Sequence, residues 1–181
     1  DGHRLARVEI PLPDGADGMP GVIVPRKTIS EVRKLLDDAS DDVTITVSAS
    51  KIHFTLGPVE LTSKLIDGTF PDYQRVIPQG NDKTLAIDCQ AFRAAVDRVA
   101  TISTEKSRAV KLSIDGNTVT LSASSADSGT ANEELEGVYG ADNMEIGFNA
   151  RYLLDIAQQI EGDTAELSLA DAAAPTIIRD Q

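Results

Sequence analysis

Cysteine, histidine and tryptophan are scarce in this chain. Its 181 residues include one cysteine, two histidines and no tryptophan, and aromatic residues make up 4%. The single cysteine, Cys89, excludes an intrachain disulfide framework and a zinc site built from several thiolates. It is compatible with a reducing compartment, and we expect a cytoplasmic protein.

Long apolar runs and catalytic motifs are also missing. No uncharged apolar segment approaches the roughly 20 residues that span a bilayer, so we expect no membrane partner. The chain has no Gly-x-Ser-x-Gly nucleophile elbow, no phosphate-binding glycine loop and no His-Glu-x-x-His zinc motif. We therefore expect a protein that is not an enzyme and that needs no metal and no cofactor.

The remaining composition is that of an ordinary soluble globular protein. Hydrophobic residues make up 41% and charged residues 25%, and a chain of this size can bury a substantial core. Acidic residues outnumber basic ones by 29 to 17, which gives a formal net charge of −12. Taken alone, that charge argues against a nucleic-acid-binding protein.

One order of elements, strand, helix and three strands, recurs along the chain at intervals of about 60 residues. Apolar residues at helical spacing predict three helices, over 26–36, 89–100 and 150–160. Apolar runs predict the strand before each helix, over 22–24, 85–87 and 144–148. Alternating apolar residues predict the strands that follow, and Asn149 is a suitable N-cap for the last helix.

Two such repeats over an antiparallel sheet make one α+β unit. We expect repeats two and three to form a domain over 73–181. Repeat one would be half of another domain, over 1–72, whose first half precedes Asp1. Residues 66–73 break every periodicity, which predicts the link between the two domains.

Basic residues concentrate in the predicted helices. Helix 26–36 has a net charge of +3, helix 89–100 has +1 and helix 150–160 is neutral, so the rest of the chain carries −16. Four polar residues share the face of the first helix opposite its apolar stripe: Arg26, Ser30, Arg33 and Lys34. Any one of these helices is compatible with an ordinary solvated surface. Together they favour a basic helical surface on an acidic body, which non-specific phosphate contact requires.

Four segments carry a resemblance to a known family. They are DGHRLA at 1–6, VIVPRK at 22–27, TSKLIDGTFPDY at 62–73 and MEIGFN at 144–149. In this order they resemble the bacterial beta sliding clamps of DNA polymerase III. The resemblance covers essentially the whole chain and implies the second half of the middle clamp domain, followed by a third domain that lacks its C-terminal end.

The resemblance implies repeated two-helix, antiparallel-sheet domains that close head to tail into a homodimeric ring. Helices line the hole and contact duplex DNA without reading its sequence. The implied DNA-facing residues are Arg26, Lys27, Arg33, Lys34, Arg93 and Arg98. The third domain would provide half of the dimer interface through edge backbone near 133–139. The implied interface residues are Ile102, Glu133 and Leu135.

The resemblance also implies a peptide pocket between the middle and third domains. It would take short linear motifs from replicative and repair DNA polymerases and from the clamp loader. The implied pocket residues are Gly2, His3, Arg4, Leu5, Pro71, Arg75, Val76, Asn149, Tyr152, Ala173 and Pro175. Ser107 stands beside the pocket where the family often has an aromatic residue, which predicts a shallower wall.

The function implied by these features is that of a DNA polymerase processivity factor. Two other classes remain open. One is an adaptor that binds peptides without a DNA role, in which helices 26–36 and 89–100 face unrelated sides. The other is a hydrolase that uses His3, which would require His3 in a cleft beside a nucleophile or a metal.

Overall fold

The computed structural model describes residues 2–37, 42–103 and 108–181. It divides into two compact units. One unit is Val8–Asp72, and the other combines the N-terminal segment up to Arg7 with Tyr73–Gln181. The predicted division at residue 72 separates the same units except for this N-terminal segment.

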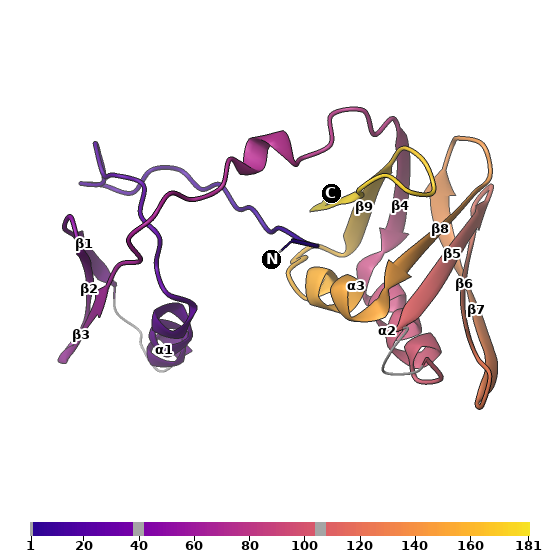
Figure 1. Ribbon diagram of the computed structural model, residues 1–181, viewed down its shortest axis with the longest axis horizontal. Helices are drawn as coiled ribbons and strands as arrows, with labels where there is room; N and C mark the ends of the chain where they lie inside the picture. Colours follow the sequence, from indigo (N-terminus) through magenta and orange to yellow (C-terminus); the bar gives the residue numbers. More distant parts are fainter. Residues whose placement is uncertain (1, 38–41, 104–107) are drawn as a thin grey trace. The chain divides into compact units, whose positions relative to one another are not determined.

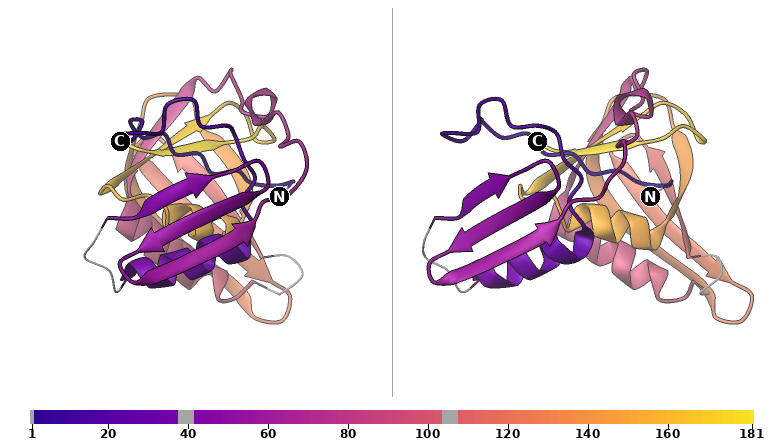
Figure 2. Two further views of the ribbon diagram at one scale, coloured as in Figure 1. Left: turned by 90° about the vertical axis from the view of Figure 1, so that its left-hand side faces the viewer. Right: turned by 60° about the vertical axis from the view of Figure 1, so that its left-hand side comes forward.

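The described residues of the Val8–Asp72 unit form one helix and three antiparallel strands. In chain order these are α1 (Arg26–Asp37), β1 (Thr44–Val47), β2 (Lys51–Leu56) and β3 (Val59–Lys64), with β2 central in the sheet. Figure 2 shows α1 lying against one face of the three strands. The helix packs through Val32, which is 7% exposed, onto a small core that includes Phe54.

Two details of this unit differ from the prediction. Residues 22–24 form no strand, because Ile23 accepts one backbone hydrogen bond, from Ile66 at 2.9 Å, instead of a ladder. The apolar stripe of α1 is only partly covered: Ile29 and Leu36 are 49% and 42% exposed. The stripe is wider than the surface that the three strands cover.

The larger unit is a seven-stranded antiparallel sheet with two helices. Its elements are β4 (Lys83–Asp88), α2 (Cys89–Ala100), β5 (Ala109–Asp115), β6 (Thr118–Ser125), β7 (Gly129–Tyr139), β8 (Met144–Asn149), α3 (Ala150–Ala157), β9 (Thr164–Leu169) and β10 (Ile177–Asp180). The strand order is β10-β9-β4-β7-β6-β5-β8. Figure 1 shows the sheet curling around α2 and α3. The predicted α+β class is confirmed, and so is the predicted order of elements in the second and third repeats.

Helix boundaries follow their caps. Helix α2 occupies the predicted residues 89–100, and the Asp88 side chain caps it by accepting a hydrogen bond from the Ala91 amide at 2.7 Å. Helix α3 ends at Ala157, not at residue 160 as predicted, because the chain tightens there into a turn with a Gln159 to Ile156 backbone bond of 2.8 Å.

Strand β7 joins the two halves of this sheet. Its residues 129–136 pair with β6, whereas residues 137–139 pair with β4. On the side away from β6, residues 129–136 have no strand partner in the described part of the chain. Part of a sheet edge therefore lies open in the middle of the strand order.

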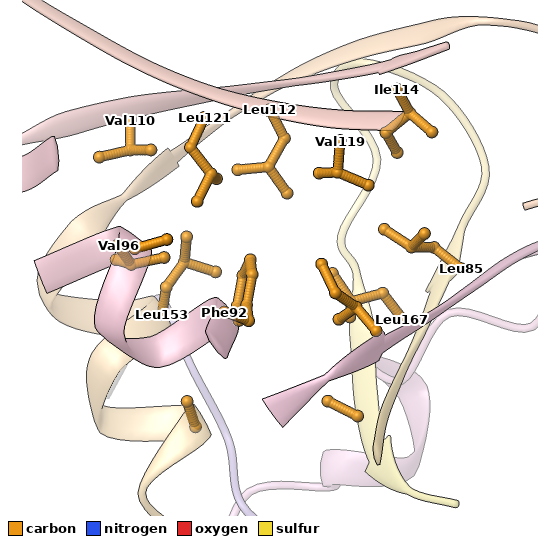
Figure 3. Packing of buried hydrophobic residues seen from close by; sticks show 14 of the residues in the cluster. Leu85, Phe92, Val96, Val110, Leu112, Ile114, Val119, Leu121, Leu153 and Leu167 are labelled. Carbon is orange, nitrogen blue, oxygen red and sulfur yellow. The ribbon is translucent and has the colours of Figure 1, made fainter. Parts of the chain in front are cut away.

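One core fills the space between the helices and the sheet. In Figure 3, Leu112 and Leu121 point from β5 and β6 toward Phe92 of α2 and Leu153 of α3. These four side chains are at most 1% exposed. The alternating apolar residues of the strands thus meet the helical stripes, as binary patterning requires.

Gly137 is the first residue of β7 that pairs with β4, opposite Ile87. An added Cβ would lie 2.8 Å from the Leu85 Cδ1 atom and 3.2 Å from the Ala86 carbonyl oxygen. We expect Gly137→Ala to lower the free energy of unfolding by about 1–3 kcal/mol, measured by urea denaturation. Gly147 in β8 is the matched control, because nothing lies within 4 Å of its added Cβ. Equal losses in Gly137→Ala and Gly147→Ala would contradict this explanation.

Candidate functional site

The start of α3 presents Tyr152. Asn149 is the N-cap, and its side-chain oxygen accepts a hydrogen bond from the Arg151 amide at 3.0 Å. This confirms the cap predicted from the sequence, and it fixes the first turn of the helix. Tyr152 is half-buried on that turn.

The N-terminal segment folds back onto this turn and forms a cluster with it. The His3 ring stacks on the Tyr152 ring with 5.8 Å between centroids and 23° between planes. The Arg4 guanidinium carbon lies 4.7 Å from the centroid of the same ring. Arg4 Nη1 also donates to the Asp155 carboxylate. We call His3, Arg4, Tyr152 and Asp155 the Tyr152 cluster.

Asp155 is the member of the Tyr152 cluster that sequence reasoning missed. It follows Tyr152 by three residues on α3, a spacing that places two side chains on one helix face. This spacing from an expected aromatic anchor was the sequence signal that could have identified Asp155 as a member of the cluster. Each contact is individually weak, about 0.5–1 kcal/mol for an exposed cation–π contact and about as much for the ion pair. The Tyr152 cluster is therefore held by several contacts that are each small compared with the stability of a domain.

Other predicted pocket residues lie in the same unit. Leu5 and Val76 are 45% and 66% exposed, so neither is a core residue and both are available for apolar contact. Arg75 ends the short 3₁₀ helix η1 (Tyr73–Arg75). Next to it, the Arg7 guanidinium lies 5.9 Å from the centroid of the Tyr73 ring.

The described hydrogen bonds of Ala173 and Pro175, two of the remaining predicted pocket residues, are made with residues outside the Tyr152 cluster. The Ala173 amide donates to Asp171 at 2.8 Å, and the Pro175 carbonyl accepts from Asn81 at 2.9 Å. Pro71 belongs to the other unit. Ser107 lies outside the described residues. The structure thus brings His3, Arg4 and Tyr152 together, and all of the pocket assignments, these three included, stay predictions.

The basic residues of α1 and α2 are exposed. On α1, Arg26, Lys27 and Arg33 point away from the buried Val32, and Lys34 pairs with Glu31 at 3.0 Å. On α2, Arg93 and Arg98 are both exposed. Whether the two helices share one DNA-facing surface stays a prediction.

Arg98 makes a two-pronged ion pair with Glu133 of β7. Arg98 Nε donates to Oε2 at 3.0 Å, and Nη2 donates to Oε1. Hydrogen bonding to Arg98 lowers the pKa of the Glu133 carboxyl, and hydrogen bonding to Glu133 raises the pKa of the Arg98 guanidinium. Because the carboxyl pKa is lowered, the stabilisation is present throughout the neutral range and is lost only as the pH falls through that lowered value.

Two of the three predicted interface residues, Glu133 and Leu135, lie on the open stretch of β7. Ile102 and Leu135 are half-buried and pack against the main core. The edge predicted near 133–139 needs correction, because residues 137–139 pair with β4. The open backbone is 129–136, since β4 is too short to continue along β7.

The surroundings of His53 and Cys89, two titratable groups that could suggest catalysis, favour a structural role. His53 Nδ1 lies 2.7 Å from the Thr62 hydroxyl on the neighbouring strand. Burial raises the pKa of the Cys89 thiol, the opposite of what a nucleophile needs. Residues 2–37, 42–103 and 108–181 contain no group of three or more His, Cys, Asp or Glu side chains that could hold a metal ion. Among the same residues, no helix has the length and apolar character to cross a membrane.

Comparison with known proteins gives consistent matches along the chain. The family model described as "DNA polymerase III beta subunit, central domain" matches residues 1–72, and the corresponding C-terminal domain model matches residues 74–181. The beta sliding clamp of Caulobacter vibrioides is 54% identical over 180 residues, which cover 99% of this chain and 48% of that protein. The chain thus spans about half the length of the curated relatives it matches.

Solved structures agree with this. A sliding clamp (DNA polymerase III subunit beta) from Bartonella birtlesii bound to griselimycin is 54% identical with a TM-score of 0.93, and the match covers 100% of this chain and 49% of that one. A Caulobacter crescentus beta sliding clamp, with polyethylene glycol at a region proposed for beta-motif tethering, has 54% identity and a TM-score of 0.94 over 99% of this chain and 48% of its own. These matches confirm the predicted sliding-clamp fold, and the chain belongs to the DNA polymerase III beta subunit family.

Proposed function

We propose that this protein is a DNA polymerase processivity factor, a ring-forming sliding clamp that encircles duplex DNA. The observation that carries the proposal is the exposure of Arg26, Lys27 and Arg33 on one helix of a chain whose net charge is −12. A basic helical face on an acidic body attracts phosphate locally and leaves the rest of the surface repulsive. The length that the chain shares with the curated clamps makes it about half of such a subunit.

A ring holds DNA by topology, so its phosphate contacts can be weak. Weak, sequence-independent contacts to the backbone allow sliding. The protein then needs neither base readout nor a catalytic group, and it acts as a cytoplasmic, non-enzymatic tether. Two copies of the full-length subunit close head to tail into the ring, with the open edge of β7 as one half of each contact.

The Tyr152 cluster supports the second part of the proposal, a peptide pocket for DNA polymerases, the clamp loader and repair proteins. The Tyr152 ring offers apolar anchoring, exposed Leu5 and Val76 in the same unit add apolar surface, and the Arg4 guanidinium offers a polar group that orients a peptide. An adaptor without a DNA role is the competing function. An adaptor would use the pocket, but its basic helices would face unrelated sides and bind no DNA, so a DNA-binding measurement separates the two functions.

Reversing the charge of Arg33 and Arg93 should weaken DNA binding. Both side chains are exposed, so the fold should persist, and the loss should shrink as salt rises because released counterions drive binding. The measurement is fluorescence anisotropy of a labelled duplex with the full-length clamp across a salt series. The slope of log affinity against log salt should fall by about 0.9 for each lost phosphate contact.

The control variant carries Lys51→Glu and Arg179→Glu. Both side chains are exposed on strands, one in each unit, so the total charge changes equally. We expect this variant to bind DNA much as the wild type does at each salt concentration. An equal loss of DNA affinity in both variants would mean that DNA binding depends only on total charge. No loss of affinity in either variant would favour the adaptor.

A further inference from the structure

We propose that Arg98 is a positioning residue for the open edge of β7, through its ion pair with Glu133, and not primarily a phosphate contact. This inference rests on the proposed function, because it takes that edge as half of the ring contact. It separates Arg98 from the other basic residues of the helices and links α2 to the assembly of the ring.

The direction in which Arg98 leaves α2 supports this separation. Arg93 and Arg98 are five residues apart, which places them about 140° apart around a helix of 3.6 residues per turn. Arg98 therefore leaves the helix on a different side from Arg93, and it reaches β7 there. In the described part of the chain, Arg93 makes no ion pair, whereas both guanidinium contacts of Arg98 go to Glu133.

Glu133 lies on the helix-facing side of the sheet. Along β7, exposure alternates, so that Glu133 and Leu135 are half-buried while Glu134 and Glu136 are exposed. The side chain of Glu133 is 27% exposed and projects between Ala131 and Leu135, which pack against the main core. A cation stabilises a carboxylate in this position, because partial burial weakens its hydration.

The pairing of Arg98 with Glu133 has a consequence for the strand edge. Residues 129–136 are the part of β7 without a strand partner on the β4 side in the described chain, and Glu133 is in their middle. Without Arg98, the carboxylate would stay on the helix-facing side without its cation and would turn toward solvent there, because the exposed Glu134 and Glu136 lie on the opposite face of the strand. The backbone of residues 129–136, which has to be extended to pair with another strand, would then lose the contact that holds it to α2.

The test measures ring dissociation by sedimentation equilibrium of the full-length clamp. We expect Arg98→Ala to weaken each contact about fivefold, as for loss of a well-oriented ion pair. A two-fold ring breaks two identical contacts, so its dimer dissociation constant should rise about 25-fold. Glu133→Ala should have a similar effect, and the double variant should add little to either single one.

Two further variants make the outcome specific. Lys111→Ala breaks an exposed ion pair with Glu145, 2.9 Å long, on strands β5 and β8, and should leave ring dissociation unchanged. Arg93→Ala should lower the salt slope of DNA binding more than Arg98→Ala does. The inference is overturned if Arg98→Ala lowers that slope as much as Arg93→Ala while ring dissociation stays within twofold, or if its effect on the ring adds to that of Glu133→Ala. Failure of the proposed function would appear separately, as an Arg93→Ala variant with unchanged DNA binding.

Discussion

Tyr152→Ala should reduce the affinity of a short clamp-binding peptide about 30-fold or more, the effect typical of removing a central aromatic anchor. The ring is the element of the Tyr152 cluster that both His3 and Arg4 contact, at 5.8 Å and 4.7 Å between the groups. Its removal also takes two ring contacts from the N-terminal segment, although the ion pair of Arg4 with Asp155 remains, so peptide binding has to order this segment further. The measurement is titration of a labelled hydrophobic peptide motif into the full-length clamp.

Arg151→Ala is the matched control for this prediction. Arg151 is exposed and precedes Tyr152 on the first turn of α3, so its replacement changes the same helix outside the Tyr152 cluster. We expect its peptide affinity to stay within about twofold of wild type. DNA binding should be normal in Tyr152→Ala, because the side chain is not on a basic helix face. Wild-type peptide affinity in Tyr152→Ala would place the pocket elsewhere.

Phe92→Ala should lower the free energy of unfolding by about 3–5 kcal/mol, which is a large fraction of the stability of an ordinary domain. Phe92 is 1% exposed, and in Figure 3 its ring lies in the middle of the core between side chains of the helices and the strands. Truncation removes apolar burial and leaves a cavity that strands anchored on several sides cannot fill. Urea denaturation followed by circular dichroism measures the loss.

Val138→Ala is the comparison for the core variant. Val138 is 71% exposed on β7, so its truncation removes little burial and creates no cavity. We expect a change within about 0.5 kcal/mol. A similar loss in the two variants would mean that the buried cluster is not the main source of stability in this unit.

Local patterns predicted the elements of this fold well. Helix α2 begins and ends at the predicted residues, because its apolar spacing and the cap at Asp88 are contained within a dozen neighbouring residues. The end of α3 was predicted three residues too late, since Ile160 continues the apolar spacing beyond the last helical turn. The prediction of a strand over 22–24 was wrong, because an apolar segment forms a ladder of hydrogen bonds only when a neighbouring strand pairs with it.

Long-range pairings could not be derived in the same way. Arg4 meets Asp155 across 151 positions, and Arg98 meets Glu133 across 35. No local periodicity encodes either sequence separation. In the sequence alone, the two residues of each ion pair are therefore two unrelated charges. The same holds for β7, whose exposure alternates along its length while its partner changes from β6 to β4 at Gly137.

The strand order also has a consequence for synthesis of the protein on the ribosome. The two outer strands of the second repeat, β4 and β5, obtain their other partners only from the third: β9 pairs with β4, and β8 pairs with β5. A nascent chain that has emerged only as far as β7 therefore exposes both margins of an unfinished sheet. Such margins invite pairing with other chains, so a translational pause after Tyr139 would favour aggregation or chaperone capture, and release of β9 from the ribosome would end that vulnerable interval.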